Sequence, residues 1–150
     1  MHIRELQPLE PLPLELLLLA DPEAQIVRSY MKRGKCYVME HHGEVIGTYV
    51  LLPTRPHTVE LVNLAVRETM QGQGLGRQLI AHALQTSREL GYKTIEVGTG
   101  NSSVGQLLLY QKWGFRITGV DRDFFTRHYA EPIVENGIPC VDMIRLQQDL

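Results

Sequence analysis

Three glycines at alternate positions mark the segment of this sequence best suited to chemistry. Residues 71–77 read Gln-Gly-Gln-Gly-Leu-Gly-Arg and lie between an apolar run at 60–66 and an amphipathic segment that reaches about residue 90. Glycines at a strand-to-helix junction let backbone N–H groups approach an anion, and the helix N-terminus adds a partial positive charge. Arg77 can add a full charge in the first turn. We interpret the segment as a phosphate-binding loop, with a simple tight turn as the alternative.

The spacing of these glycines does not fit two common nucleotide-binding loops. A dinucleotide-binding fingerprint, Gly-x-Gly-x-x-Gly starting at Gly72, would need a glycine at position 77, where the chain has an arginine. The phosphate loop of ATP- and GTP-binding proteins needs Gly-Lys followed by Ser or Thr, but no lysine occurs between Lys35 and Lys93. A nucleotide-binding protein of either kind is therefore not predicted.

The order Gln-x-x-Gly-x-Gly, directly after a strand, resembles the acetyl-CoA pyrophosphate loop of the GNAT family of N-acetyltransferases. A second segment, Tyr-Gln-Lys-Trp-Gly-Phe at 110–115, looks like the Tyr-x-x-x-Gly-Phe segment that closes the fourth helix of that family. The two motifs occur in the family's order and together cover residues 58–116. The resemblance implies an acetyl-CoA-dependent enzyme that acetylates a primary amine by direct attack on the thioester. A non-catalytic acyl-CoA-binding or sensing module is the alternative.

The resemblance also implies which residues bind acetyl-CoA. In the family's fold the pantetheine arm inserts between two splayed parallel strands, and it would pair with backbone groups of residues 64–66 that otherwise lack partners. Asn101 is a further candidate contact, although it precedes Tyr110 by two residues more than in the ribosomal-protein N-acetyltransferases. The implied cofactor-binding residues are Leu64, Ala65, Val66, Gln71, Gly72, Gln73, Gly74, Leu75, Gly76, Arg77 and Asn101.

Acetyl transfer to an amine needs a base that removes the ammonium proton and an acid that protonates the departing thiolate. By its position in the motif, the resemblance implies that Tyr110 is the acid; half-buried packing is the simpler alternative. Glu60 lies four residues before Leu64, where histone-acetylating members of the family carry their base. Glu96 is the rival, because the ribosomal-protein N-acetyltransferases place a glutamate in the fifth strand.

Strand alternation favours Glu60 as the base. If residues 60–66 alternate regularly, Glu60 shares a face with Val62, Leu64 and Val66, and the intervening side chains point to the other face. A charged residue on an apolar face is costly unless it is paired or used. The alternative is a carboxylate that simply emerges into solvent at the end of the strand.

The composition predicts one compact domain over residues 1–150. Hydrophobic residues make up 43% of the 150, enough to bury about two-thirds of the unfolded surface. The 15 basic and 17 acidic residues give a net charge of −2, which makes no electrostatic case for nucleic acid or anionic membrane. With no signal peptide or membrane-spanning run, we expect a cytoplasmic protein. Cys36 and Cys140 lack metal-ligand spacing, so no metal is expected.

The expected partner is an amine acceptor, either a small molecule or a peptide or protein amine, and the sequence permits a homodimer. Residues 121–139 contain an Asn-Gly turn, which predicts a two-residue hairpin. This segment is longer than a simple connection needs, and long structured connections often form binding walls. We therefore hypothesise that it lines the acceptor pocket.

The hydrophobic pattern predicts an α/β chain of alternating strands and helices. The unit at 58–98, a strand, a helix and a strand, should be a right-handed parallel crossover. Together with the resemblance, this implies the GNAT acyl-CoA N-acyltransferase fold, a mixed and mostly antiparallel sheet with one parallel pair and about four flanking helices. The expected strands are 2–6, 35–40, 45–52, 58–66, 93–98, 115–120 and 141–146, and the expected helices are 14–20, 21–34, 75–90 and 101–112. Asp21 is the expected N-cap of the second helix, because a proline follows it.

Overall fold

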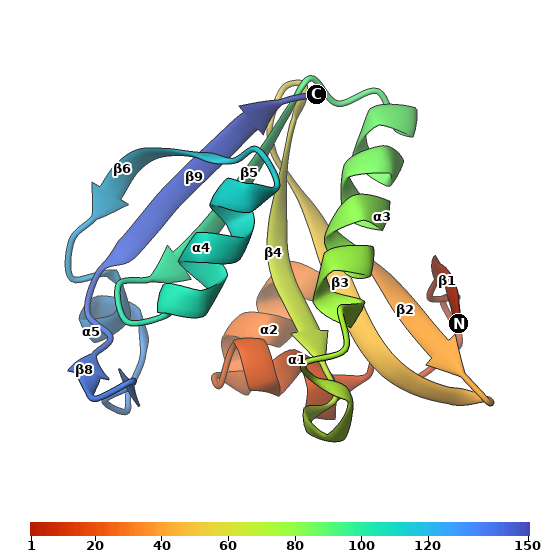
Figure 1. The fold of residues 1–150 in the computed structure, drawn as a ribbon, viewed down its shortest axis with the longest axis horizontal. Coiled ribbons are helices and arrows are strands. Elements are labelled where there is room, and N and C mark those ends of the chain that lie inside the picture. The colour runs from red at the N-terminus through yellow and green to blue at the C-terminus, as the bar shows by residue number, and fades with distance from the viewer.

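A seven-stranded sheet organises the chain in the computed structural model, which describes residues 1–150. The strand order is β1-β2-β3-β4-β5-β9-β6, and every neighbouring pair is antiparallel except β4 and β5 (Figure 1). The strands are β1 (His2–Glu5), β2 (Lys35–His41), β3 (Glu44–Arg55), β4 (Thr58–Val66), β5 (Thr94–Gly100), β6 (Arg116–Asp121) and β9 (Met143–Asp149), with a separate hairpin of β7 (Val134–Glu135) and β8 (Ile138–Pro139).

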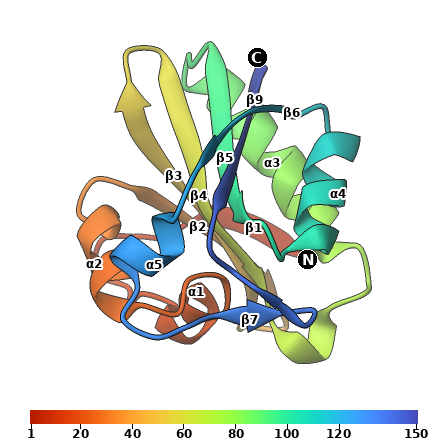
Figure 2. The same ribbon diagram turned by 90° about the vertical axis from the view of Figure 1, so that its left-hand side faces the viewer.

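Helices cover both faces of this sheet. Figure 2 shows α1, α2 and α5 on one side and α3 and α4 on the other. The helices are α1 (Leu14–Ala20), α2 (Ala24–Met31), α3 (Leu75–Glu89), α4 (Val104–Lys112) and α5 (Phe124–His128), and a short 3-10 turn, Glu68–Met70, precedes α3. None of the helices is both long and apolar enough to cross a membrane.

The two faces of the sheet bury two separate apolar clusters, because successive side chains of a strand point to opposite sides. On β2, Tyr37 and Met39 enter the cluster under α3 and α4, whereas Cys36 and Val38 enter the cluster under α1 and α2. Helix α3 seals its side with a stripe of buried residues at helical spacing, namely Leu75, Leu79, Ile80, Ala83 and Leu84.

The predicted GNAT fold is confirmed, with one parallel pair in a mostly antiparallel sheet. The predicted Asn136-Gly137 hairpin turn joins β7 to β8, and both residues have positive φ. One local expectation is wrong: helix α2 begins at Ala24, and Asp21, expected as its N-cap, is the C-cap of α1. Residues 121–139 also contain α5, so the α-helices number five.

Candidate functional site

A cavity of about 1170 Å³ opens where β4 and β5 separate. The two strands pair only over three positions, from Thr58 beside Thr94 to Glu60 beside Glu96. Beyond Glu60, β4 keeps β3 as its only neighbouring strand, so the edge of β4 that faces β5 has no strand to pair with. Unpaired backbone groups along a buried strand edge need other hydrogen-bond partners, and an extended ligand could supply them.

A β-bulge interrupts β4 inside this segment. Val50 of β3 lies opposite Asn63, and the next residue, Leu51, lies opposite Leu61, so Val62 is an extra residue in the ladder. Because of this extra residue, Leu61 and Leu64 both pack into the cluster under α3, whereas Val62 packs toward α1 and α2. The expectation that Glu60 shares a face with Leu64 and Val66 is therefore wrong. Glu60 lies between Val59 and Leu61, and points to the α1–α2 face with Val62.

The glycine loop forms the opposite end of the cavity from the α1–α2 connection. Gly72 and Gly74 have φ values of +80° and +81°, a left-handed conformation that side chains disfavour, and Gly74 is the N-cap of α3. No side chain caps the helix, so its first N–H groups remain available to a ligand. A Cβ atom at Gly72 or at Gly76 would meet no atom within 4 Å, which means that the space above the loop is open.

The loop is anchored at one end and charged at the other. The Gln71 side chain donates from Nε2 to the Val66 carbonyl oxygen at 3.0 Å, which ties the loop to the end of β4. The Arg77 guanidinium folds back to within 3.0 Å of the position that a Gly74 Cβ would occupy. Apart from the exposed Gln73, every residue from 71 to 77 lines the cavity, as do Leu64, Ala65 and Val66.

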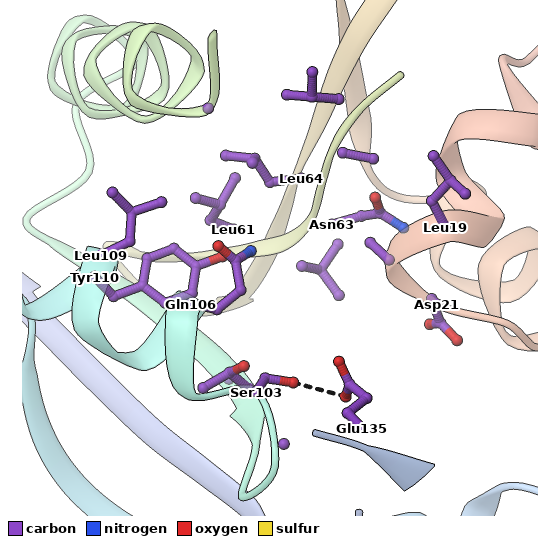
Figure 3. Close-up of a pocket in the computed structure, with 18 of the residues that line it drawn as sticks. Leu19, Asp21, Leu61, Asn63, Leu64, Ser103, Gln106, Leu109, Tyr110 and Glu135 are labelled. Carbon is purple, nitrogen blue, oxygen red and sulfur yellow. Dashed lines mark hydrogen bonds between the residues drawn. The ribbon is translucent and has the colours of Figure 1, made fainter. Parts of the chain in front are cut away.

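Tyr110 reaches the cavity from α4 on the side of β5. Its side chain is only 5% exposed, packs edge-on against Phe115 at 5.6 Å between ring centroids, and lines the cavity. Burial raises the pKa of Tyr110 to about 12, and no side-chain or backbone group of the protein hydrogen-bonds to its hydroxyl. Figure 3 shows the ring projecting from α4 toward β4, beside Leu61 and Gln106. A buried hydroxyl without a protein partner can serve as a proton or hydrogen-bond donor to a ligand.

The two candidate carboxylates lie side by side in the sheet but in different surroundings. Glu60 lines the cavity, and burial raises its pKa, an effect that the nearby Arg145 opposes and Glu96 reinforces. Glu96 does not line the cavity. One of its oxygens accepts from Thr54 at 3.0 Å and the other from Arg55 at 2.6 Å. Glu60 is thus the carboxylate open to a substrate, while Glu96 is held by its protein partners.

The Asn101 side chain is hydrogen-bonded to the segment that precedes β9. Its Oδ1 accepts from the backbone N–H groups of Val141 and Asp142 at 2.8 and 2.9 Å, and its Nδ2 donates to the Pro139 carbonyl oxygen at 3.0 Å. Asn101 does not line the cavity. In this structure its side chain therefore positions residues 139–142. No group of three or more His, Cys, Asp or Glu side chains is arranged to hold a metal ion.

The part of the cavity away from the glycine loop contains residues that were not predicted. Asn63, Asp21 and Tyr30 line it from β4 and from the α1–α2 region, and residues of the 121–139 segment close it. This segment therefore lines the cavity, and its contact with an acceptor stays a prediction. Asn63 carried a signal in the sequence, because it is a polar residue inside an apolar strand. Asp21 and Tyr30 carried none, since their position depends on how α1 and α2 pack on the sheet.

Comparison with known proteins gives consistent matches. Residues 4–115 match a model described as the acetyltransferase (GNAT) family. The chain is 57% identical over 136 residues to an uncharacterised N-acetyltransferase, YvbK, of Bacillus subtilis, covering 91% of this chain and 88% of that protein. A GNAT family acetyltransferase from Elizabethkingia anophelis with acetyl-CoA bound superposes with a TM-score of 0.97 at 46% identity, covering 99% and 97% of the two chains. A Bacillus subtilis acetyltransferase in complex with CoA gives a TM-score of 0.93 at 53% identity, with 99% and 97% covered.

Proposed function

Because the chain belongs to the GNAT acetyltransferase family, we propose that it transfers the acetyl group of acetyl-CoA to an amine within one catalytic domain. The observation that carries the proposal is the cavity between β4 and β5. The unpaired edge of β4, the glycine loop at the start of α3 and the free hydroxyl of Tyr110 all meet there. Acetyl-CoA supplies the thioester-bound acetyl group.

The residues of the cavity fit acetyl-CoA. The open space above Gly72 and Gly76 and the uncapped N-terminus of α3 suit a pyrophosphate, with Arg77 adding a positive charge. The β4 backbone at residues 64–66 is free to hydrogen-bond an extended arm, and one of its N–H groups can stabilise the charge that develops on the thioester oxygen. Gln73 would take part through its backbone alone. Asn101 would act by positioning residues 139–142.

Glu60 and Tyr110 handle the two protons of the reaction in this proposal. Glu60 accepts the proton that the ammonium group loses, so that the nitrogen lone pair forms the new C–N bond while the C–S bond breaks. A pKa raised by burial makes Glu60 a better base than an ordinary surface carboxylate. The Tyr110 hydroxyl donates to the sulfur that departs with the electron pair. The nitrogen loses its second proton as the amide forms, and this proton balances the one that the thiolate gains. No covalent bond to the protein is needed.

The acceptor is an amine carried by a small molecule, a peptide or a protein. We also propose a cytoplasmic location, because acetyl-CoA is produced and consumed inside cells.

A panel of amines with acetyl-CoA, followed by release of free thiol, tests the proposal. We expect turnover with at least one class of primary amine and an acetylated product by mass spectrometry. Calorimetric titration with acetyl-CoA distinguishes an enzyme from the alternative, a non-catalytic module. Tight binding of acetyl-CoA without acetylation of any amine would indicate an acyl-CoA-binding or sensing module.

A further inference from the structure

The acceptor end of the cavity is rich in aromatic rings and carboxylates. Its walls come from the α1–α2 connection, α2, α5 and the β7–β8 hairpin. Figure 2 shows α1, α2 and α5 on one side of the sheet, and β7 running from that side toward the start of α4. The aromatic rings are those of Tyr30, Phe124, Phe125 and Tyr129, and the carboxylates are those of Asp21, Glu60 and Glu135. Aromatic faces combined with carboxylates provide a favourable environment for a cationic nitrogen.

None of these three carboxylates forms an ion pair within the protein. The cation in this part of the lining, Arg145, lies 3.5 Å from Asp121 and stacks over Phe124 at 5.7 Å. Arg145 also lowers the pKa of Glu60 and so offsets part of the negative charge there, whereas Asp21 has no ion pair with a cation. Glu135 is exposed and accepts from the Ser103 hydroxyl at 2.8 Å and from the Ser102 hydroxyl at 3.4 Å. Asp21 and Glu60 are less exposed. A carboxylate without an ion pair in a partly desolvated space is costly, and a positively charged ligand would remove that cost.

Asp21 is the most deeply placed of the three. It is 9% exposed, and its Oδ1 accepts from the Tyr129 hydroxyl at 2.9 Å and from the Glu23 backbone N–H at 3.4 Å. The Tyr30 hydroxyl, which also lies beside Asp21, links this carboxylate to Asn63. Burial raises the pKa of Asp21, and the hydrogen bond from Tyr129 opposes this effect.

Asn63 supplies a second, independent indication of a ligand. The residue is 3% exposed and lines the cavity, and its Nδ2 donates to the Leu17 carbonyl oxygen at 2.9 Å and to the Tyr30 hydroxyl at 2.8 Å. Its Oδ1 has no hydrogen-bond partner. Figure 3 shows Asn63 projecting from β4 toward α1, on the side of the cavity where Asp21 lies. A buried carbonyl oxygen without a donor is uncommon, and a ligand N–H group would satisfy it.

We propose that the acceptor is a diamine. One amino group faces Glu60 and takes the acetyl group, while the other remains an ammonium ion held by Asp21 and Asn63 among the aromatic rings. This inference rests on the proposed acetyl transfer and adds the class of acceptor. An amino acid fits less well, because its carboxylate would enter a space that already holds the carboxylates of Asp21 and Glu60.

A comparison of matched acceptors tests the diamine assignment. The probes are a 1,n-diaminoalkane, the monoaminoalkane of the same chain length and the ω-amino acid of the same length, each over a series of lengths. We expect kcat/KM for the best diamine to exceed that of its monoamine by about tenfold or more, beyond the factor of about two from having two amino groups. The ω-amino acid should be poorer than the monoamine. Equal values, or a preference for the ω-amino acid, would overturn the proposal.

Two variants test whether Asp21 accounts for the preference for a diamine over a monoamine. Asp21→Asn keeps an oxygen for the Tyr129 hydroxyl but removes the charge, so the advantage of the diamine over the monoamine should fall to near the statistical factor. Glu23→Gln removes the same charge two positions away, outside the cavity lining, and should retain the advantage. A full diamine advantage in Asp21→Asn would refute the assignment of that residue. Thermal unfolding of both variants reports whether they fold.

Binding measured without chemistry separates this inference from the proposed function. Calorimetric titration of each amine into the protein saturated with CoA should show the diamine binding about tenfold or more tightly than the monoamine. If the diamine binds more tightly but no amine is acetylated, the diamine-binding site stands and the acetyl-transfer proposal fails. If both amines are acetylated and bind equally, acetyl transfer stands and the inference fails.

Discussion

Replacing Tyr110 with phenylalanine tests the chemical step separately from binding and folding. The substitution removes one oxygen and keeps the ring, which packs against Phe115 at 5.6 Å. The hydroxyl has no hydrogen-bond partner in the protein, so its removal leaves no protein group unsatisfied. We therefore expect the free energy of unfolding to change by less than about 1 kcal/mol, and the affinity for acetyl-CoA to change little.

The expected loss of rate follows from the acidity of this hydroxyl. Burial raises the pKa of Tyr110 to about 12, whereas an ordinary thiol has a pKa of about 8.5. Complete transfer of the proton from the hydroxyl to the thiolate would therefore cost about 5 kcal/mol. A sulfur bound in the same desolvated space would have a raised pKa for the same reason, which narrows the gap. The hydroxyl then acts mainly by donating to the sulfur as charge develops. Loss of one such donor costs about 3 kcal/mol, or roughly 10²-fold in kcat.

The assay follows thiol release at saturating acetyl-CoA, with affinity measured by calorimetry. Tyr92→Phe is the matched control, because Tyr92 lies outside the cavity lining, and it should keep the wild-type kcat. With a pKa of about 12, Tyr110 stays protonated between about pH 6 and pH 10, so its loss should lower kcat across that range without moving a basic limb. A folded Tyr110→Phe protein with wild-type kcat would refute the reasoning and leave Tyr110 a packing residue.

Two further predictions concern the loop and the base. Gly74→Val should raise the acetyl-CoA dissociation constant by about tenfold or more, while the free energy of unfolding falls by only about 1 kcal/mol. Gly43→Val, in the β2–β3 turn with a similar φ of +78°, is its control, and an unchanged dissociation constant for Gly74→Val would contradict the phosphate-loop assignment. Glu60→Gln should remove the acidic limb of the pH profile of kcat/KM, because the base works only when deprotonated. Glu96→Gln should retain that limb, and the reverse result would assign the base to Glu96. Because the pKa of Glu60 is raised by burial, the folded state binds its proton more tightly than the unfolded state does. The contribution of Glu60 to the free energy of unfolding therefore falls as pH rises through that pKa. At pH 7 Glu60→Gln should have a higher Tm than the wild type.

The glycine-loop residues that line the cavity could be predicted as a group because they follow one another along the chain. A strand, three glycines and an amphipathic helix occur within residues 58–90, so local chemistry was enough to predict a loop with free N–H groups at the start of α3, and its binding of an anion stays a prediction. The position of Tyr110 in the cavity wall also agrees with its place in the second motif. The splay of β4 and β5 came from the family resemblance alone, since hydrophobic periodicity does not report where two paired strands separate.

The other end of the cavity, around Asp21, Asn63 and Tyr129, could not be predicted in the same way, because its residues come from distant parts of the sequence. The hydrogen bond between Tyr129 and Asp21 joins residues 108 positions apart. An aspartate followed by a proline is typical of a helix start, so the local pattern favoured an N-cap. In the structure Asp21 instead ends α1, and its side chain faces the cavity.

The bulge in β4 explains why the alternation argument for Glu60 failed. Regular alternation would have put Asn63 on the same face as Leu61, in the leucine-rich cluster under α3, where a carboxamide has no partner. The extra residue at Val62 turns Asn63 to the other face, where it donates to Leu17 and Tyr30. A bulge also bends its strand and increases the local twist, and this one lies just past the last position at which β4 pairs with β5. A polar residue out of phase with its apolar strand is therefore a physical reason to expect a break in the ladder, and here the break coincides with the opening of the cavity.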